Sequence, residues 1–303
     1  MFPYNYVKSE IPFELSLAGK SSLRAHYEVK FSSACRTDYP EGNNVFADYF
    51  VPQNTEFPLL IISHGYGDAS LAPCLTLARL LAKNGVAAFV PYLPFHSHRL
   101  PAGRQGSMLT GDARMWFEIN RRAIIEIRQV VDWAYTREEI IKDKIGVTGI
   151  SLGGMISSIA MAVDKRIKEG VFVTIGGNLE ELGWGNKSMG NQVGHNCTRE
   201  ECRAVYEQYP EYLLKIKKVG LESVKPAKEC FLIDPLTFAE YLRERPVLMI
   251  NGKDDEVVSP RSTRILWEAC RKPPLTWIPG THSGAYAQSI IINDRIVEFL
   301  NSI

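Results

Sequence analysis

The chain has 303 residues, of which 45% are hydrophobic and 23% are charged. This composition is that of a globular protein and excludes a disordered or a collagen-like chain. The 35 basic side chains are balanced by 34 acidic ones, which leaves a net charge of +1. A nearly neutral chain lacks the basic excess of a dedicated nucleic-acid binder, so no nucleic-acid partner is expected.

The N-terminal stretch has no basic segment followed by an apolar one, so no secretory signal is predicted. No run of about 18 consecutive apolar residues occurs, and no membrane-spanning helix is expected. The cysteines are scattered without a C-x-x-C pair, which favours reduced and mostly buried thiols. Together these features predict a cytoplasmic protein without a membrane partner.

The first part of the chain predicts a hairpin followed by alternating strands and helices. Residues 25–31 and 44–51 alternate apolar and polar positions, and the turn-rich sequence PEGNN between them would join them as a hairpin. Residues 57–63 form a continuous apolar run, which is typical of a fully buried parallel strand. Residues 71–84 have apolar side chains at helical spacing, and residues 86–91 predict another buried strand.

The alternation continues through the rest of the chain. Residues 112–136 predict a long helix with one apolar stripe, and a further helix opens at Ser151. Strands that alternate with helices imply a mostly parallel central sheet with helices on both faces, so the predicted fold class is α/β. The other predicted elements are strands at residues 144–148, 171–175, 246–251 and 275–278 and an amphipathic helix at residues 290–300.

Residues 178–240 interrupt this alternation, because they contain no clear strand. Thr198 and Glu201 form a capping box that opens a helix, and Asp234 with Pro235 reads as the start of another. A long helical excursion between two core strands is usually functional, and a cap over an active site is the expected role. The predicted domains are a core (residues 1–177 and 241–303, with residues 1–57 as N-terminal strands or extension) and a helical cap insertion (residues 178–240).

Residues 149–153 read Gly-Ile-Ser-Leu-Gly, a G-x-S-x-G sequence. An apolar strand is predicted before it and a helix of small residues after it. This is the arrangement of a nucleophile elbow, a sharp turn that exposes the hydroxyl of Ser151 above the sheet. An ordinary Gly-Ser turn between a strand and a helix has the same sequence, so the prediction depends on partners elsewhere in the chain.

A serine hydroxyl needs a general base, and the base needs a carboxylate that orients it. In folds with this elbow, the acid and then the histidine follow later strands. His282 follows the strand predicted at residues 275–278 and is the expected base. Asp254 and Asp255 both follow the strand predicted at residues 246–251; Asp255 is preferred as the acid, and Asp254 is the alternative.

The negative charge that forms on an attacked carbonyl needs donors that are already in place. The backbone N–H of Leu152, directly after the nucleophile, is one expected donor. The loop after the strand at residues 57–63 supplies the second, and the N–H of Tyr66 is the candidate. His64 in the same loop precedes Ser151 in the chain, so it is expected to hold the loop by hydrogen bonds rather than act as the base.

These segments resemble those of the α/β-hydrolase superfamily. In such hydrolases the acid loop commonly reads Gly-x-x-Asp-x-x-Val, and Gly252, Asp255 and Val258 fit that frame. The resemblance implies an α/β-hydrolase fold and acyl transfer to water without a cofactor, and it leaves the substrate open. The matching pieces are HGYG (64–67), GISLGG (149–154), residues 234–258 and PGTHSG (279–284).

Two other clusters contain residue types found in metal sites. His96 and His98 form an H-x-H pair, and His195 lies near Cys197 and Cys202 in the sequence. Each cluster lacks a clear full set of ligands. No metal and no other cofactor are therefore predicted.

The sequence predicts a carboxylesterase-type serine hydrolase that acts on small-molecule esters of small to medium acyl chain. Trp116 and Trp184 are candidate substrate-binding residues, because aromatic side chains often line ligand pockets. A serine peptidase or amidase with the same three residues is the alternative, since carboxylates in the insertion could recognise a free amine. These are Glu180, Glu181, Glu200 and Glu201. A non-catalytic binding protein of the same fold is a third hypothesis, and association into a homo-oligomer stays open.

Overall fold

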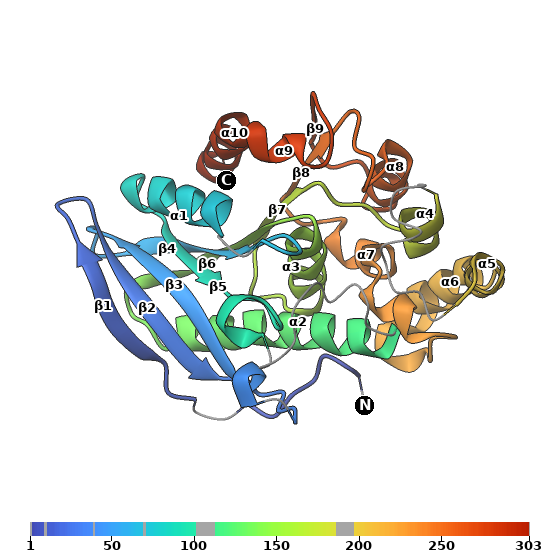
Figure 1. Cartoon of the computed structure of the whole chain (residues 1–303), viewed down its shortest axis with the longest axis horizontal. Coiled ribbons are helices and arrows are strands. Elements are labelled where there is room, and N and C mark those ends of the chain that lie inside the picture. Colours follow the sequence, from blue (N-terminus) through green and yellow to red (C-terminus); the bar gives the residue numbers. More distant parts are fainter. Residues whose placement is uncertain are drawn as a thin grey trace.

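The computed structural model describes residues 2–8, 11–38, 40–68, 71–100, 113–185 and 197–302. Over these ranges the chain forms a single mixed sheet with helices on both faces (Figure 1). The strands are β1 (Glu14–Lys20), β2 (Arg24–Ser32), β3 (Asn44–Pro52), β4 (Phe57–Ser63), β5 (Ala87–Pro91), β6 (Ile140–Ile150), β7 (Glu169–Val173), β8 (Val247–Gly252) and β9 (Leu275–Ile278).

The strands lie side by side in the order β1-β2-β3-β5-β4-β6-β7-β8-β9. β2 is antiparallel to both of its neighbours, β1 and β3, and β3 is antiparallel to β5. From β5 to β9 every pairing is parallel. Because the carboxyl ends of parallel strands meet at one edge of a sheet, the loops after β4, β6, β8 and β9 emerge together. This topology confirms the α/β class and the mostly parallel sheet.

Two helices cover one face of the sheet. α1 (Ala72–Lys83) follows β4 and α10 (Ser289–Asn301) lies near the end of the chain, and the two helices contact each other over the sheet (Figure 1). Leu77 of α1 and Ile292 of α10 belong to the same buried cluster as Ile62 of β4. The strand that precedes the loop at residues 64–67 is therefore held from this side by packed aliphatic side chains.

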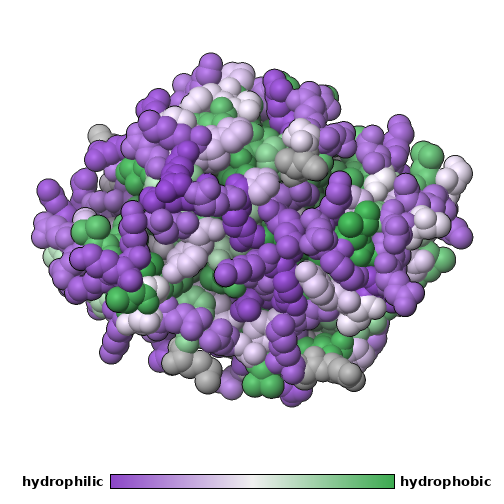
Figure 2. All heavy atoms as spheres, turned by 180° about the vertical axis from the view of Figure 1, so that it is seen from behind, coloured by the Kyte–Doolittle hydropathy of each residue, from purple (hydrophilic) through white to green (hydrophobic). Residues whose placement is uncertain are grey.

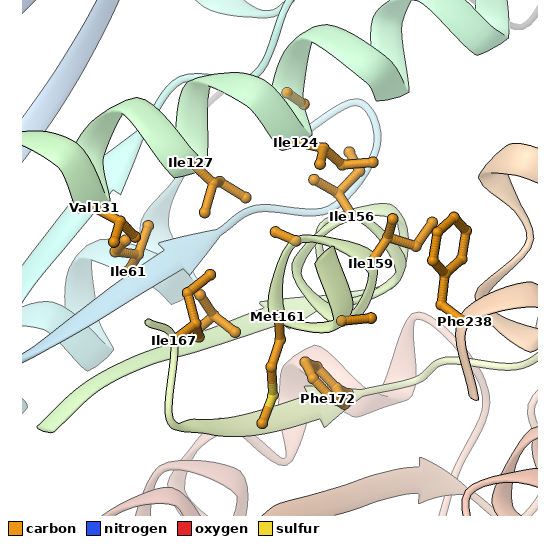
Figure 3. Packing of buried hydrophobic residues seen from close by; sticks show 14 of the residues in the cluster. Ile61, Ile124, Ile127, Val131, Ile156, Ile159, Met161, Ile167, Phe172 and Phe238 are labelled. Atoms are coloured by element: carbon orange, nitrogen blue, oxygen red, sulfur yellow. The ribbon is translucent and has the colours of Figure 1, made fainter. Parts of the chain in front are cut away.

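The opposite face carries α2 (Ala113–Tyr135) and α3 (Leu152–Val163). Figure 3 shows Val131 of α2 beside Ile61 of β4, with Ile156 of α3 in the same cluster. Branched aliphatic side chains from three elements thus interlock beneath the start of α3. The turn that carries Gly149, Ser151 and Gly153 rests on this packed base, which favours one fixed geometry.

The described part of the predicted insertion is helical and contains no strand. The Thr198–Glu201 capping box is present, and the Asp234 side chain caps the helix that begins at Pro235. These helices gather at the end of the molecule away from β1 (Figure 1). Their division from the core as a separate cap stays a prediction. The elements are α4 (Leu179–Trp184), α5 (Arg199–Tyr206), α6 (Tyr209–Val219), the short 3-10 helices η4 (Leu221–Ser223) and η5 (Glu229–Ile233), α7 (Pro235–Phe238) and η6 (Ala239–Leu242).

Four short elements complete the architecture at the ends of strands. They are η1 (Pro40–Asn43) before β3, η2 (Ser97–Arg99) after β5, α8 (Pro260–Ala269) after β8 and α9 (Gly284–Ala287) before α10.

Figure 2 shows the molecule from behind, where most of the surface is hydrophilic and hydrophobic residues form small separate groups. Leu214 and Val219 of α6 and Ile290 of α10 are among the exposed hydrophobic side chains. Within the described ranges, none of the helices combines the length and apolar character needed to span a bilayer.

Candidate active site

Ser151 lies between the end of β6 and the start of α3, in a strained turn. Its φ is 54° and its ψ is −120°, a backbone conformation that residues other than glycine rarely adopt. A Cβ on Gly149 would lie 2.4 Å from the carbonyl carbon of Gly153, and a Cβ on Gly153 would lie 2.3 Å from the carbonyl oxygen of Ser63. Both glycines are therefore needed for the close approach of β6, α3 and the end of β4.

The structure brings Ser151, His282 and Asp255 together in one hydrogen-bonded line. The Oγ of Ser151 lies 3.0 Å from Nε2 of His282, and Nδ1 of His282 lies 2.8 Å from Oδ2 of Asp255. The Asp255 side chain is fully buried, and that of His282 is 13% exposed. A carboxylate can only accept, so Nδ1 carries the proton and the lone pair of Nε2 faces the serine hydroxyl.

The two adjacent aspartates face different surroundings. Asp254 is exposed, and its backbone N–H donates to the carbonyl of Gly280 at 3.2 Å. Asp255 turns inward, where its Oδ1 also accepts from the N–H groups of Val257 and Val258 at 2.9 and 2.7 Å. Of the two candidates for the acid, Asp255 is the one that contacts His282.

The loop at residues 64–67 lies next to the start of α3. A Cβ on Gly153 would lie 2.4 Å from the carbonyl oxygen of His64, so the two segments are in close contact. The backbone N–H of Leu152 belongs to the first turn of α3, where no helical carbonyl is available to it. The amide of Tyr66 lies in the loop across from it, so the two predicted donors come from adjoining segments.

His64 is fully buried and holds this loop, as expected. Its Nε2 accepts from the N–H of Leu93 at 3.0 Å, and its Nδ1 lies 2.8 Å from the carbonyl oxygen of Gly65. Burial, with a smaller contribution from the neighbouring His96, lowers the pKa of His64 to about 3. The ring is therefore neutral at physiological pH, and both of its nitrogens are occupied by backbone partners.

The candidate substrate-binding residues have different surroundings. The Trp116 ring lies 5.8 Å from the Tyr66 ring, so it stands beside the loop at residues 64–67. Trp116 also packs against Phe117, Leu232 and Ile233, which form a small apolar cluster. These contacts make an apolar wall between the start of α2 and the predicted insertion.

The second tryptophan, Trp184, lies in α4 with its indole against the thiol of Cys202. Cys202, the fourth residue of α5, also neighbours Cys197, the residue before the N-cap of that helix. Contacts between these two positions commonly fix the entry of a helix. The described surroundings of Trp184 are therefore those of the helix α5.

The histidine and cysteine clusters do not form a metal site in the part of the chain that the structure describes. His96 points to the loop at residues 64–67, where its Nε2 accepts from the N–H of Gly67 at 3.1 Å. His98 is exposed and stacks on Tyr92 with ring centroids 5.8 Å apart. His195 lies outside the described residues.

Two contacts at the site were not anticipated from the sequence. One is the bond from Gly67 to His96, and the other is the bond from the backbone N–H of His282 to Oε2 of Glu256 at 3.0 Å. The H-x-H sequence drew attention to His96, but only as a fragment of a metal site. Glu256 stood beside the expected acid, and nothing in the sequence distinguished its role.

Curated relatives of the chain include proteins from Mycobacterium tuberculosis and Bacillus subtilis. An uncharacterized protein of Mycobacterium tuberculosis (strain H37Rv) is 27% identical over 286 residues, which are 88% of this chain and 62% of that protein. The chain thus spans less than two thirds of that relative. YitV of Bacillus subtilis (strain 168), whose name proposes an esterase, is 27% identical over 71% of this chain and 74% of its own length.

Solved structures share the fold. The acetyl xylan esterase from Paenibacillus sp. R4 superposes with a TM-score of 0.66 and 17% identity, and the match covers 99% of this chain and 90% of the esterase. At this identity the likeness establishes the α/β-hydrolase fold. The model of the family "Alpha/beta hydrolase domain containing 18" matches residues 4–218, more than half of the sequence. The chain therefore belongs to this family of α/β-hydrolase domains.

Proposed function

We propose that the protein is a serine hydrolase that cleaves carboxylic esters of small to medium acyl chain. Ser151 is the nucleophile, His282 the general base and Asp255 the acid that orients it. The observation that carries the proposal is the line of hydrogen bonds from Ser151 Oγ at 3.0 Å to His282 and from His282 at 2.8 Å to Asp255. The relative YitV, whose name proposes an esterase, supports ester chemistry.

In the first half of the reaction, Ser151 Oγ attacks the carbonyl carbon of the ester while His282 Nε2 takes the hydroxyl proton. The carbonyl electrons move to oxygen, and the backbone N–H groups of Leu152 and Tyr66 donate to that oxyanion. The imidazolium then gives its proton to the alcohol oxygen. The bond between carbonyl carbon and alcohol oxygen breaks, the alcohol leaves, and the acyl group stays on Ser151.

In the second half, water loses a proton to His282 Nε2 and attacks the acyl carbonyl. The oxyanion forms in the same place and collapses, Ser151 Oγ leaves and regains its proton, and the carboxylic acid departs. Asp255 stays ionised throughout. It holds the Nδ1 proton of His282 and stabilises the imidazolium in both halves.

The apolar wall beside the loop at residues 64–67 favours a substrate whose acyl or alcohol group is uncharged. Trp116 contacts the Tyr66 ring on one side and the Leu232–Ile233 pair of the insertion on the other. We infer that residues 178–240 act as a cap that completes this wall. Its contacts with the start of α2 argue for a pocket of limited size.

The test compares wild type with Ser151→Ala on p-nitrophenyl acetate, butyrate and octanoate. Replacement of exposed Ser302 by Ala is the matched control, because it removes a hydroxyl far along the chain from the proposed site. We expect Ser151→Ala to lower kcat at least about a thousandfold, as removal of the nucleophile does in serine hydrolases, with Ser302→Ala unchanged. Among the wild-type rates, acetate and butyrate should exceed octanoate.

Each other result contradicts a part of the proposal. Ester hydrolysis that survives in Ser151→Ala would place the nucleophile elsewhere. A folded wild type that cleaves peptide amides much faster than esters would make the protein an amidase with the same three residues. A wild type that neither turns over any of these substrates nor reacts with a fluorophosphonate at Ser151 would make it a binding protein.

A further inference from the structure

The loop at residues 64–67 is tied to the loop after β5 by two imidazole rings. His64 accepts from the N–H of Leu93 at 3.0 Å, and His96 accepts in return from the N–H of Gly67 at 3.1 Å. The two rings meet edge to face with centroids 4.8 Å apart. Each loop thus carries a histidine that binds the backbone of the other loop.

The backbone partners define the protonation of His96. Since a backbone N–H can only donate, Nε2 of His96 is without a proton where it meets Gly67. Since a carbonyl can only accept, Nδ1 of His96 donates to the carbonyl of Pro94 at 3.0 Å. Only the neutral ring with its proton on Nδ1 satisfies both partners.

The backbone on both sides of His96 has an unfavourable conformation that directs the ring at Gly67. Phe95 and Ser97, the residues on either side of His96, have φ values of 61° and 50°. Residues other than glycine rarely adopt such a positive φ, and they keep it where the surrounding structure requires it. Here they direct a buried ring, 7% exposed, at a single backbone N–H of the neighbouring loop.

The bond to Gly67 lies directly beside the amide proposed to bind the oxyanion. Tyr66 stands between Gly65, whose carbonyl accepts from His64, and Gly67, whose N–H donates to His96. The Tyr66 ring also packs edge to face against His96 with centroids 5.7 Å apart. A displaced Gly67 would therefore turn the peptide of Tyr66, and an oxyanion donor acts only when it already points at the charge.

We propose that His96 is a positioning residue that holds the loop at residues 64–67 in its reactive orientation, and that it does so only as the neutral imidazole. The proposal rests on the proposed function, because it assigns the Tyr66 amide to the oxyanion. Protonated His96 has an N–H on both nitrogens, so it repels the Gly67 N–H and releases the loop.

The surroundings of His96 disfavour that proton until the pH is low. Burial is the largest effect and lowers the pKa of His96, and the guanidinium of Arg99 lowers it further. Asp68 acts in the opposite direction, as does the hydrogen bond to Pro94, and the neighbouring His64 is itself neutral. The latch formed by His96 and Gly67 is therefore closed at neutral pH and opens in acid.

The test uses two replacements of His96 and one of His98. His96→Leu keeps the bulk but removes the acceptor, whereas His96→Gln places an uncharged oxygen near the position of Nε2. His98→Leu is the matched control, because His98 belongs to the same H-x-H sequence but is exposed and stacks on Tyr92. Steady-state hydrolysis of p-nitrophenyl acetate from neutral to acid pH gives kcat and KM for each variant.

We expect His96→Leu to lower kcat about tenfold to a hundredfold, with KM within about twofold of wild type. This decrease does not exceed the one caused by removal of an oxyanion donor. His96→Gln should recover most of kcat. On the acid side of the pH profile, the slope of log kcat against pH in wild type should rise from one to two at low pH, because a second proton binds. In His96→Gln this slope should stay at one. His98→Leu should follow wild type throughout.

Exchange of the Gly67 amide with deuterium, followed by NMR, separates the two proposals. We expect exchange at least about tenfold faster in His96→Leu and near the wild-type rate in His96→Gln, with amides of β7 unchanged as the folding control. If wild type hydrolyses no ester, the proposed function fails, while this exchange still decides whether His96 holds the loop. Unchanged exchange, equal losses of kcat in both His96 variants, or identical acid slopes would overturn the inference.

Discussion

Asp254 and Asp255 are neighbours in sequence with opposite surroundings. The backbone of Asp254 binds Gly280 in the loop that carries His282, so its side chain is left outside. Asp255 turns inward and accepts from two backbone N–H groups as well as from His282. The backbone bonds of the turn thus decide which carboxylate meets the histidine.

These surroundings predict a large difference between two conservative replacements. Asp255→Asn should lower kcat for ester hydrolysis by about four orders of magnitude, the cost of the same change in a serine protease, because the amide favours the wrong tautomer of His282. Asp254→Asn should stay within about twofold of wild type. Steady-state kinetics of both variants, with thermal unfolding as a check on folding, measure this. Equal losses in the two variants would contradict the assignment of the acid.

The residues with recognisable local sequence could be predicted, and those defined by distant contacts could not. Ser151 lies in the five-residue sequence G-x-S-x-G, so its surroundings can be recognised locally. His282 and Asp255 could be chosen because each follows a later predicted strand. His96 acts through a bond to Gly67, 29 positions away. No local pattern encodes such a contact, and the short H-x-H sequence indicated a different chemistry.

One buried carboxylate joins both ends of the predicted insertion. Asp234 accepts from the N–H groups of Asn178 and Leu179 at 3.0 and 2.9 Å, where the insertion begins, and from that of Leu236 at 2.9 Å, where it ends. The Tyr206 hydroxyl of α5 donates to it at 3.1 Å. Burial raises the pKa of Asp234, and the hydrogen bonds from these four donors counteract that rise. The ionised form of the carboxylate is therefore stabilised by all four.

Replacement of Asp234 should therefore loosen the insertion. Asp234→Asn puts an amide N–H₂ against backbone N–H donors and leaves at least one of them buried without an acceptor, which costs about 1–3 kcal/mol. We expect lower unfolding free energy in urea and faster proteolysis within residues 178–240. Tyr206→Phe, which removes one donor and leaves the backbone bonds intact, should show a smaller effect. An Asn variant as stable and resistant as wild type would contradict this role.

The strands with a clear apolar pattern could be predicted from the sequence, whereas the exposed edge strand β1 could not. β4, β5 and β8 are buried and contain continuous apolar runs, and the hairpin of β2 and β3 alternates apolar and polar positions. β9 lies at the edge of the sheet and is mostly half-buried, but its short strand was also predicted. β1 was not predicted, because most of its side chains are exposed and it pairs only with β2. The strand predicted at residues 171–175 ends earlier, at Val173, because Thr174 adopts a φ of 50°.

His64 links the stability of the whole protein to pH. Its pKa is lowered by burial to about 3, whereas an unfolded histidine titrates near 6.5. Between these values the unfolded chain binds a proton that the folded protein does not. Stability from this residue is therefore complete above about pH 6.5 and is lost as the pH falls toward about 3, at roughly 1.4 kcal/mol per pH unit.

We expect the unfolding free energy of wild type, measured in urea from pH 7 to pH 4, to fall below about pH 6.5. In His64→Gln the slope should be smaller by one proton, roughly 1.4 kcal/mol per pH unit, because glutamine does not titrate. His98→Gln, which replaces an exposed histidine, is the matched control. The same slope in wild type and His64→Gln would show that His64 is not held neutral.

The bonds from Asn178 and Leu179 to Asp234 mean that the polypeptide leaves and re-enters the sheet at neighbouring points. The entropy of closing a loop whose ends already meet changes only slowly with its length. The stretch between these residues can thus be lengthened, shortened or exchanged for that of another hydrolase without pulling β7 from β8. Under the proposed function, such a graft would alter which molecules reach Ser151 and leave the proposed nucleophile, base and acid in place, so that new selectivity would arise from one continuous piece of the gene.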